Sequence, residues 1–200
     1  MSERMNQVVY WSAVGAFAAC AVFLAVITFM IVMRPDSPPK LDLGADFSLQ
    51  DYNGNTITQA AFEGQPSVLF FGFTNCPEIC PLTVYELTNW FEEIGPEADE
   101  IAAFFVTVDP ERDSPEVLAD YLKPQSDRVI GITGSVVDVE ALQKGWRVYS
   151  KKVPLEGGDY TVDHTALLYL LDRNGDYWGH INYGASSEEA VRKLRDLVNS

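Results

Sequence analysis

Apolar and polar residues alternate along this chain in a pattern that predicts short strands followed by helices. Two segments with strand character, Phe47–Gln50 and Thr56–Thr58, flank Asn53-Gly54, a dipeptide that favours the tight turn of a β-hairpin. A continuous apolar run then extends over Val68–Phe73. A run of this length without polar residues is typical of a central strand that is covered on both faces. The soluble part of the chain is therefore expected to open with a hairpin and continue into a buried strand.

The alternation of strands and helices continues to the end of the chain. The expected elements after the first buried strand are a helix over 78–94, a strand over 101–108, a helix from Ser114, a strand over 128–133, a helix over 135–146, strands over 166–171 and 177–182, and a helix from Ser186. Strands that alternate with helices indicate parallel pairing with right-handed crossovers. This α/β order, with its opening and closing hairpins, resembles the thioredoxin layout.

An uncharged apolar segment of 26 residues, Val8–Met33, precedes these elements. At about 1.5 Å per residue, such a helix is long enough to cross a hydrocarbon core of about 30 Å. A cleaved signal peptide has a shorter apolar region and small residues before the cleavage site, whereas this segment ends in Ile31-Val32-Met33-Arg34. The sequence therefore predicts one uncleaved transmembrane helix. Cys20 within it is interpreted as a lipid-facing or packing residue.

The predicted domain organisation has four parts: a short flank at 1–7, the transmembrane anchor at 8–33, a proline-rich linker at 34–43 and a single domain at 44–200. Charge determines the orientation poorly, since Arg4 lies on one side of the anchor and Arg34 and Lys40 on the other. The flank is too short for a mitochondrial presequence. We therefore expect a single-pass protein of a bacterial inner membrane with its domain in the periplasm, and the mitochondrial inner membrane is the less favoured alternative.

The domain carries a strong acidic excess. The full chain has a net charge of −15, and Glu3, Arg4 and Arg34 are the only charged residues before Asp36. The remainder therefore contains 12 basic and 28 acidic residues, a net charge of −16. Such a charge argues against nucleic acid or anionic lipid as the ligand of the domain.

Two of the three cysteines, Cys76 and Cys80, lie where the buried strand gives way to the first long helix. The N-terminus of a helix favours a thiolate over a thiol, because its backbone N–H groups are unpaired and its dipole is positive there. Positions i and i+4 share one face of a helix, so the two sulfurs can point the same way. This pair suits either metal binding or disulfide exchange. The alternative, two small core residues beside prolines, is less favoured, because the two cysteines lie together among turn residues.

A third ligand could come from one of the two histidines. His164 lies just before a predicted strand, whereas His180 lies inside a hairpin strand and is interpreted as structural or surface. Two thiolates and an imidazole can bind Cu(I) or Cu(II), and with a fourth ligand they can bind zinc. His164 could instead be a satisfied loop histidine. Gly157-Gly158 predicts a mobile loop over 151–159 that carries His164 towards the cysteines when metal binds.

Three motifs together resemble the Sco/SenC family of copper-binding, thioredoxin-like assembly factors: GFTNCPEICP at 72–81, VDPERDSP at 108–115 and DHT at 163–165. The resemblance covers the chain from about Leu43 to its end. It implies that Cys76, Cys80 and His164 bind copper and that the protein helps to load the CuA centre of cytochrome c oxidase, in subunit II. It also implies a membrane anchor, a domain outside the cytoplasm, a protein that donates copper and a thiol reductant.

This chain departs from the usual family pattern at two positions. Many members have histidine where it has Asn75 and aspartate where it has Glu78. Neither position is a ligand in the family, so we expect altered affinity or potential with binding retained. Asp109 carries over as an acid near the metal that modulates Cu(II) or transfer, although a capping aspartate before proline explains it equally well. Asp163 is expected to orient the imidazole or its loop, or to be a simple surface residue.

Three functions compete on this sequence. The first is a copper metallochaperone, which is not an enzyme. The second is a thiol-disulfide oxidoreductase or a peroxidase-like reductase, with Cys76 and Cys80 as the catalytic redox pair. Thioredoxin-type catalysts usually separate this pair by two residues, whereas three separate it here, and simple exchange has no need of His164. The third is a protein with a structural zinc site.

Overall fold

The computed structural model describes residues 20–29 and 43–200. The chain divides into two compact units, Met1–Lys40 and Leu41–Ser200. Residues 20–29 form a helix, and no helix in the described part of the chain is both long enough and apolar enough to cross a bilayer. The predicted anchor at 8–33 and the linker at 34–43 lie largely outside the described residues, and so does the whole flank at 1–7.

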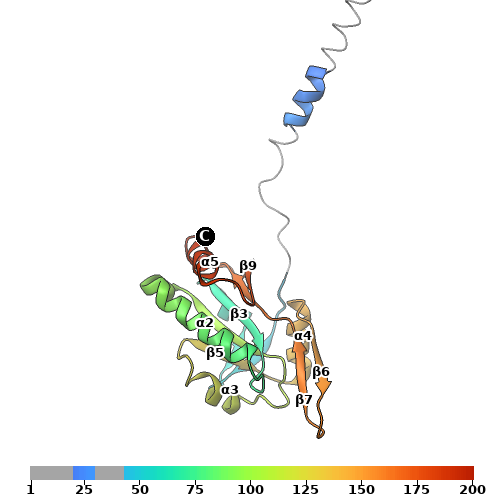
Figure 1. Cartoon of the computed structure of the whole chain (residues 1–200), viewed down its shortest axis with the longest axis vertical. Helices are drawn as coiled ribbons and strands as arrows, with labels where there is room; N and C mark the ends of the chain where they lie inside the picture. The colour runs from blue at the N-terminus through green and yellow to red at the C-terminus, as the bar shows by residue number, and fades with distance from the viewer. Residues whose placement is uncertain (1–19, 30–42) are drawn as a thin grey trace, which may run out of the picture. The chain divides into compact units, whose positions relative to one another are not determined.

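The domain is built on a seven-stranded sheet with the order β2-β1-β5-β4-β3-β8-β9 (Figure 1). Its strands are β1 (Ser48–Asp51), β2 (Thr56–Thr58), β3 (Ser67–Gly72), β4 (Ala102–Thr107), β5 (Val129–Thr133), β8 (Leu167–Leu171) and β9 (Tyr177–Asn182). The three central strands β3, β4 and β5 pair in parallel, and the remaining pairs are antiparallel. The expected parallel centre and the two hairpins are confirmed.

Helices join and cover these strands. They are η1 (Gln59–Phe62), α2 (Ile79–Ile94), η2 (Gly95–Glu100), α3 (Pro115–Leu122), α4 (Val136–Gly145) and α5 (Ser187–Val198). The crossovers through α2 and α3 run in the same direction along the sheet, from β3 to β4 to β5, so their right-handed connection puts both helices on one face. α5 packs against α2. This arrangement is a thioredoxin-like α/β fold.

Local capping explains where three of the helices begin. Ser114, Ser135 and Ser186 each accept a hydrogen bond from a backbone N–H in the first turn of α3, α4 and α5. α2 differs, because its N-cap residue Glu78 makes no such bond. The helix that follows the cysteine motif therefore begins without the usual oxygen cap.

The segment before His164 is a hairpin and not the predicted mobile loop. β6 (Ser150–Pro154) and β7 (Tyr160–His164) pair antiparallel in a separate two-stranded sheet, and His164 is the last residue of β7. The prediction failed because most β6 side chains are exposed and many are charged or polar, so no buried apolar run marks the strand. Gly157 and Gly158, both with φ near +90°, form the turn and not a hinge beside His164.

The strand that leads into the cysteine motif is packed tightly at its end. A Cβ atom at Gly72 would lie 2.8 Å from the ring of Phe105, well inside van der Waals contact. Only glycine fits there, because the Phe105 ring, which is 0% exposed, has no room to move away. The loop that carries Cys76 therefore starts from a rigid base.

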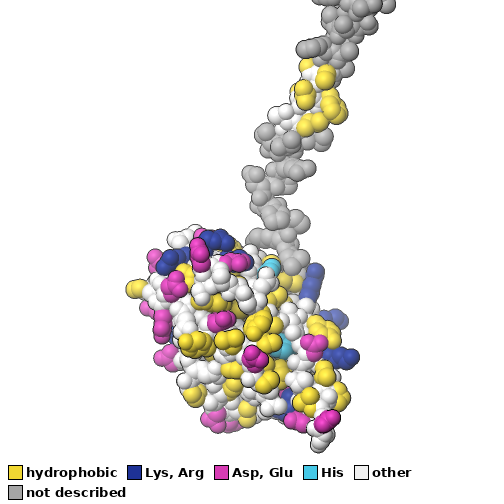
Figure 2. Space-filling model, viewed as in Figure 1, with side chains coloured by type: hydrophobic (Ala, Val, Ile, Leu, Met, Phe, Trp, Pro, Cys, Tyr) yellow, Lys and Arg dark blue, Asp and Glu magenta, His cyan; other side chains and the backbone are white. Residues whose placement is uncertain are grey.

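The surface of the domain agrees with its composition. Figure 2 shows Asp and Glu side chains spread over the visible face, with Lys and Arg gathered in fewer places. The acidic excess is thus distributed over a solvated surface.

Candidate metal centre

At the start of α2, a sulfur atom of the cysteine motif accepts a backbone hydrogen bond. The backbone N–H of Cys76 donates to the carbonyl oxygen of Phe73 at 3.3 Å, which closes a turn directly after β3. The backbone N–H of Cys80 then donates to Sγ of Cys76 at 3.4 Å. Cys80 is the second residue of α2, so this N–H is one of those that a helix leaves unpaired at its N-terminus. The Cys76 sulfur therefore takes the place of a capping oxygen.

The two sulfurs differ in their access to solvent. Both cysteines are free thiols, but Cys80 is 0% exposed whereas Cys76 is half-buried. A partner molecule can thus reach Cys76 and not Cys80. The pair has one accessible member and one that faces the core.

The structure brings His164 to the cysteine pair. Nε2 of His164 lies 3.8 Å from Sγ of Cys80. Nδ1 of the same ring lies 3.0 Å from the carbonyl oxygen of Thr165. Because a carbonyl oxygen only accepts, Nδ1 carries the proton of the neutral ring, and Nε2 presents a lone pair to the sulfur. The ring is held in the orientation that a metal ligand requires.

The separation of these donors fits a shared metal ion. An ion bound to a thiolate at about 2.3 Å and an imidazole at about 2.0 Å, with an angle of about 110–120°, holds the two donor atoms about 3.5–3.7 Å apart. The observed 3.8 Å is close to this value. No three His, Cys, Asp or Glu side chains in the described residues form a ready-made metal cage. Cys80 and His164 thus lie at the separation of two ligands of one ion, and the half-buried Cys76 lies next to Cys80.

Hydrogen bonding separates the acidities of the two thiols. The S–H of Cys80 donates to the sulfur of Cys76, and this bond is the largest cause that lowers the pKa of Cys76 to about 4, although burial acts against it. The same bond between the sulfurs, followed by burial, raises the pKa of Cys80 well above its usual range. At neutral pH, Cys76 is thus the thiolate and Cys80 the thiol that donates to it.

This difference in pKa predicts an unusual reactivity profile. Alkylation of the reduced full chain by iodoacetamide should modify Cys76 at a nearly constant rate between about pH 8 and pH 6, because the thiolate persists throughout. An ordinary thiol with a pKa of about 8.5 slows about 75-fold over the same interval. The rate constant and modified residue can be measured by peptide mass spectrometry after timed quenching.

Replacing Cys80 by alanine is the matched control for this profile. It removes the S–H donor and should raise the pKa of Cys76, so alkylation should slow as the pH falls towards 6. If the wild-type chain slows as steeply as free glutathione does, the assigned thiolate is wrong.

The two acidic residues that the sequence predicts near the metal, Asp109 and Asp163, are not bonded to this centre. Asp109 is 1% exposed, accepts a hydrogen bond from Tyr160 Oη at 2.8 Å and pairs with Nε of Arg112. Asp163 is exposed and alternates with His164 on β7, so its side chain points to the opposite face of that strand. Within the described residues, no hydrogen bond joins either carboxylate to the cysteines or His164.

A different acid, Asp113, supports the cysteine loop. It is fully buried and accepts hydrogen bonds from the backbone N–H of Thr74 at 3.1 Å, from Thr74 Oγ1 at 2.5 Å and from Thr107 Oγ1 at 2.6 Å. Burial raises the pKa of Asp113, and the threonine donors oppose that rise. Sequence reasoning missed this residue because nothing in the pattern distinguishes it from Asp109 four positions earlier.

His180 has the structural role expected from the sequence. Its Nδ1 lies 2.7 Å from the hydroxyl of Tyr177, and the two rings stack with centroids 6.4 Å apart. His180 is thus held by contacts within β9.

Comparison with known proteins gives a consistent result. The SCO1/SenC family model matches residues 35–199. The SCO2-like protein RP587 of Rickettsia prowazekii is 33% identical over 159 residues, which cover 78% of each chain. Two solved structures, both with copper bound, are also similar. Bradyrhizobium japonicum ScoI has 39% identity and a TM-score of 0.72, covering 78% of this chain and 99% of that one. Yeast Sco1 has 34% identity and a TM-score of 0.74, covering 80% and 90%.

Proposed function

Because this chain belongs to the SCO1/SenC family, we propose that it is a copper metallochaperone that helps to assemble the CuA centre in subunit II of cytochrome c oxidase. The observation that carries the proposal is the approach of His164 Nε2 to the buried sulfur of Cys80, beside a Cys76 thiolate. The copper-bound relatives support copper as the cargo.

The donor set suits copper that has to be passed on. Two sulfurs and an imidazole bind Cu(I) and can also hold Cu(II). A structural zinc site has four ligands and is closed, whereas this centre offers three donors. Cys76 is half-buried, so an incoming thiolate of the acceptor can approach the copper ion from its side. Ligand exchange at the Cys76 side then releases the cargo.

The thiol state would control loading. Copper binds the pair only when both sulfurs are reduced, and an oxidising compartment favours a disulfide between them. A thiol reductant must therefore act before copper is delivered, and a donor protein must supply the metal. We place the domain in the periplasm, held to a bacterial inner membrane by the apolar segment 8–33.

A second candidate is a thiol-disulfide oxidoreductase that reduces cysteines of the oxidase subunit. The observation in its favour is the lowered pKa of Cys76, since an accessible thiolate is the attacking group in exchange. Attack by Cys76 on the disulfide of the acceptor would form a mixed disulfide. Cys80 would then displace the reduced acceptor and leave a Cys76–Cys80 disulfide in this chain. His164 has no necessary part in that sequence.

Transfer to a purified acceptor tests the proposal. The reduced full chain, loaded with copper, is mixed with the metal-free, reduced CuA domain of subunit II, and the absorption bands of the CuA centre are followed. We expect the bands to appear at a copper-chelator concentration that suppresses loading by an equal amount of free copper. If copper stays on the chain while the metal-free chain reduces an oxidised CuA domain, the oxidoreductase replaces the chaperone.

A further inference from the structure

The strand that carries His164 is not held by the main sheet. In Figure 1, β6 and β7 lie beside α4 and apart from the seven-stranded sheet. The backbone bonds of the main sheet therefore do not fix the position of β7, although the Thr165 N–H donates to the Tyr149 carbonyl oxygen just beyond it. Beyond that bond and the short connection from His164 to β8 at Leu167, side-chain contacts position the hairpin.

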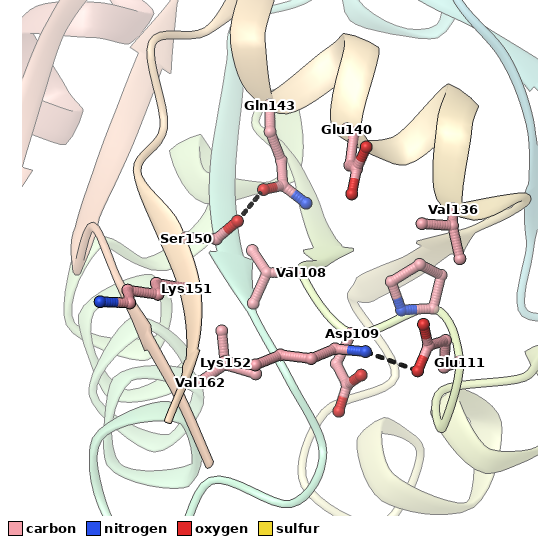
Figure 3. A pocket seen from close by; sticks show the side chains of 11 residues that line it. Val108, Asp109, Glu111, Val136, Glu140, Gln143, Ser150, Lys151, Lys152 and Val162 are labelled. Atoms are coloured by element: carbon pink, nitrogen blue, oxygen red, sulfur yellow. Dashed lines mark hydrogen bonds and ion pairs between the residues drawn. The ribbon is translucent and has the colours of Figure 1, made fainter. Parts of the chain in front are cut away.

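Part of the hairpin lines a cavity, while Val162 of β7 is buried and packs into the core. A cavity of about 250 Å³ lies between the hairpin, α4 and the segment after β4 (Figure 3). Val108, Glu140 and Val162 are among the residues that line it. Two polar bridges span it, from Lys152 to Glu111 and from Ser150 to Gln143. An exposed ion pair such as the first contributes little to stability.

Arg112 makes a further set of contacts with the turn end of the hairpin. Its Nη1 donates to Oδ1 of Asp159 at 3.1 Å and to the carbonyl oxygen of Tyr160 at 2.9 Å. The guanidinium also lies over the Tyr160 ring, 3.8 Å from its centroid. Its Nε pairs with Asp109 on the body of the domain. One side chain thus joins β7 to the loop after β4.

Asp109 completes the connection. Its carboxylate is 1% exposed and has two partners, Arg112 and the hydroxyl of Tyr160. A buried carboxylate is strongly destabilising when it loses its partners. The three side chains therefore hold one another in a single arrangement across the boundary between hairpin and body.

Strand geometry links this connection to the metal centre. Side chains two residues apart share one face of a strand, so Tyr160, Val162 and His164 all project from the same face of β7. Tyr160 and His164 lie about 13 Å apart along the strand at about 3.3 Å per residue. Tyr160 begins β7 and His164 ends it. Contacts that hold Tyr160 therefore restrain the strand that presents the imidazole.

We propose that Arg112, Asp109 and Tyr160 form a latch, the Arg112 latch, that holds β7 so that His164 lies against Cys80. Arg112 is then a positioning residue, which acts on copper only through His164. The inference rests on the proposed function, because it assumes that His164 is a copper ligand. It assigns to the polar motif after β4 a role in presenting the imidazole.

A double-mutant cycle tests the latch. Cu(I) affinity is measured by chelator competition on the reduced full chain carrying Arg112→Ala, His164→Ala or both. If the released hairpin presents His164 about one-tenth of the time, Arg112→Ala weakens copper binding about 10-fold. The same change on the His164→Ala background should have no further effect, since its route of action is gone.

Two further variants sharpen the result. Tyr160→Phe removes only the hydrogen bond from the Tyr160 hydroxyl to Asp109. It should lower copper affinity less than Arg112→Ala does, and this loss should also disappear on the His164→Ala background. Arg173→Ala is the matched control, because Arg173 also bonds a carboxylate, that of Glu100, and a backbone carbonyl, but joins other elements. It should leave copper affinity unchanged.

The outcomes separate the latch from the proposed function. If Arg112→Ala and Tyr160→Phe both leave copper affinity unchanged while His164→Ala lowers it, the latch is wrong and the ligand set stands. An equal loss from Arg112→Ala with and without His164 also overturns the latch, because the effect then acts on the cysteine loop. If His164→Ala itself changes nothing, the proposed ligand set fails and the latch fails with it.

Discussion

Replacing either Cys76 or Cys80 by serine is expected to abolish high-affinity copper binding, with a loss in Cu(I) affinity of about 1,000-fold or more. A thiolate is a soft ligand that matches Cu(I), whereas a serine hydroxyl is hard and stays protonated at neutral pH. Each substitution also leaves a two-donor site. The measurement is chelator competition on the reduced full chain, read from the absorbance of the chelator's copper complex.

Cys20→Ser provides the matched control for this loss. Cys20 is the remaining cysteine and belongs to the other compact unit of the chain, so its removal should leave copper affinity unchanged. The two substitutions at the centre should also differ in reactivity. At the centre, Cys80→Ser leaves the accessible thiol of Cys76, whereas Cys76→Ser leaves the buried thiol of Cys80. Full copper affinity in either variant would refute the ligand assignment.

His164→Ala is the second large effect and distinguishes the two candidate functions. Loss of the imidazole, a direct ligand in this proposal, should weaken copper binding about 100-fold or more, since removal of an outer-shell partner alone costs about 10–100-fold. Thiol-disulfide exchange needs only the sulfurs, so its rate should fall much less. Copper affinity and the rate of exchange with a small disulfide are measured on the same preparation.

His180→Ala is the control for His164→Ala. His180 contacts Tyr177 in β9 and should contribute nothing to copper affinity. A chain that keeps full copper affinity without His164 and loses its exchange activity would be an oxidoreductase whose histidine acts on the thiols. That result would reverse the order of the two proposals.

Much of the fold could be predicted from the sequence, because the relevant signals are local. The Asn53-Gly54 and Asn174-Gly175 turns, the apolar run into Gly72 and the helical spacing up to Ile94 each specify an element without tertiary information. The β6–β7 hairpin could not be predicted in this way. Its exposed, charged strand has no apolar periodicity, and it is held by contacts with Asp109 and Arg112, far away in sequence.

The candidate donors could be named from the sequence, but not their arrangement. The spacing of Cys76 and Cys80 and the position of His164 predict the three ligands, and the structure brings His164 to Cys80. The acidities of the two thiols depend on the hydrogen bond between the two sulfurs and on which sulfur is buried, and the sequence does not contain that information. The expected loop is instead a strand that ends at His164, whose Nε2 lies 3.8 Å from Sγ of Cys80, and its movement on metal binding stays a prediction.

The acidic residues show the same limit. Asp109 and Asp113 occur in one polar motif, and sequence alone does not separate their roles. Asp109 accepts hydrogen bonds from Arg112 and Tyr160, whereas Asp113 accepts them from the threonines that support the cysteine loop. Which carboxylate serves which network depends on how β4, the hairpin and the loop after β3 meet in space.

The most direct test of the account is the inner coordination shell of copper in the wild-type chain, measured by X-ray absorption spectroscopy on the reduced, Cu(I)-loaded protein. We expect two sulfur scatterers and one nitrogen scatterer with the multiple-scattering pattern of imidazole, and loss of that nitrogen in His164→Ala. A wild-type shell of sulfur alone, or one in which His164→Ala leaves the imidazole pattern intact, would contradict the claim that Cys76, Cys80 and His164 hold one copper ion.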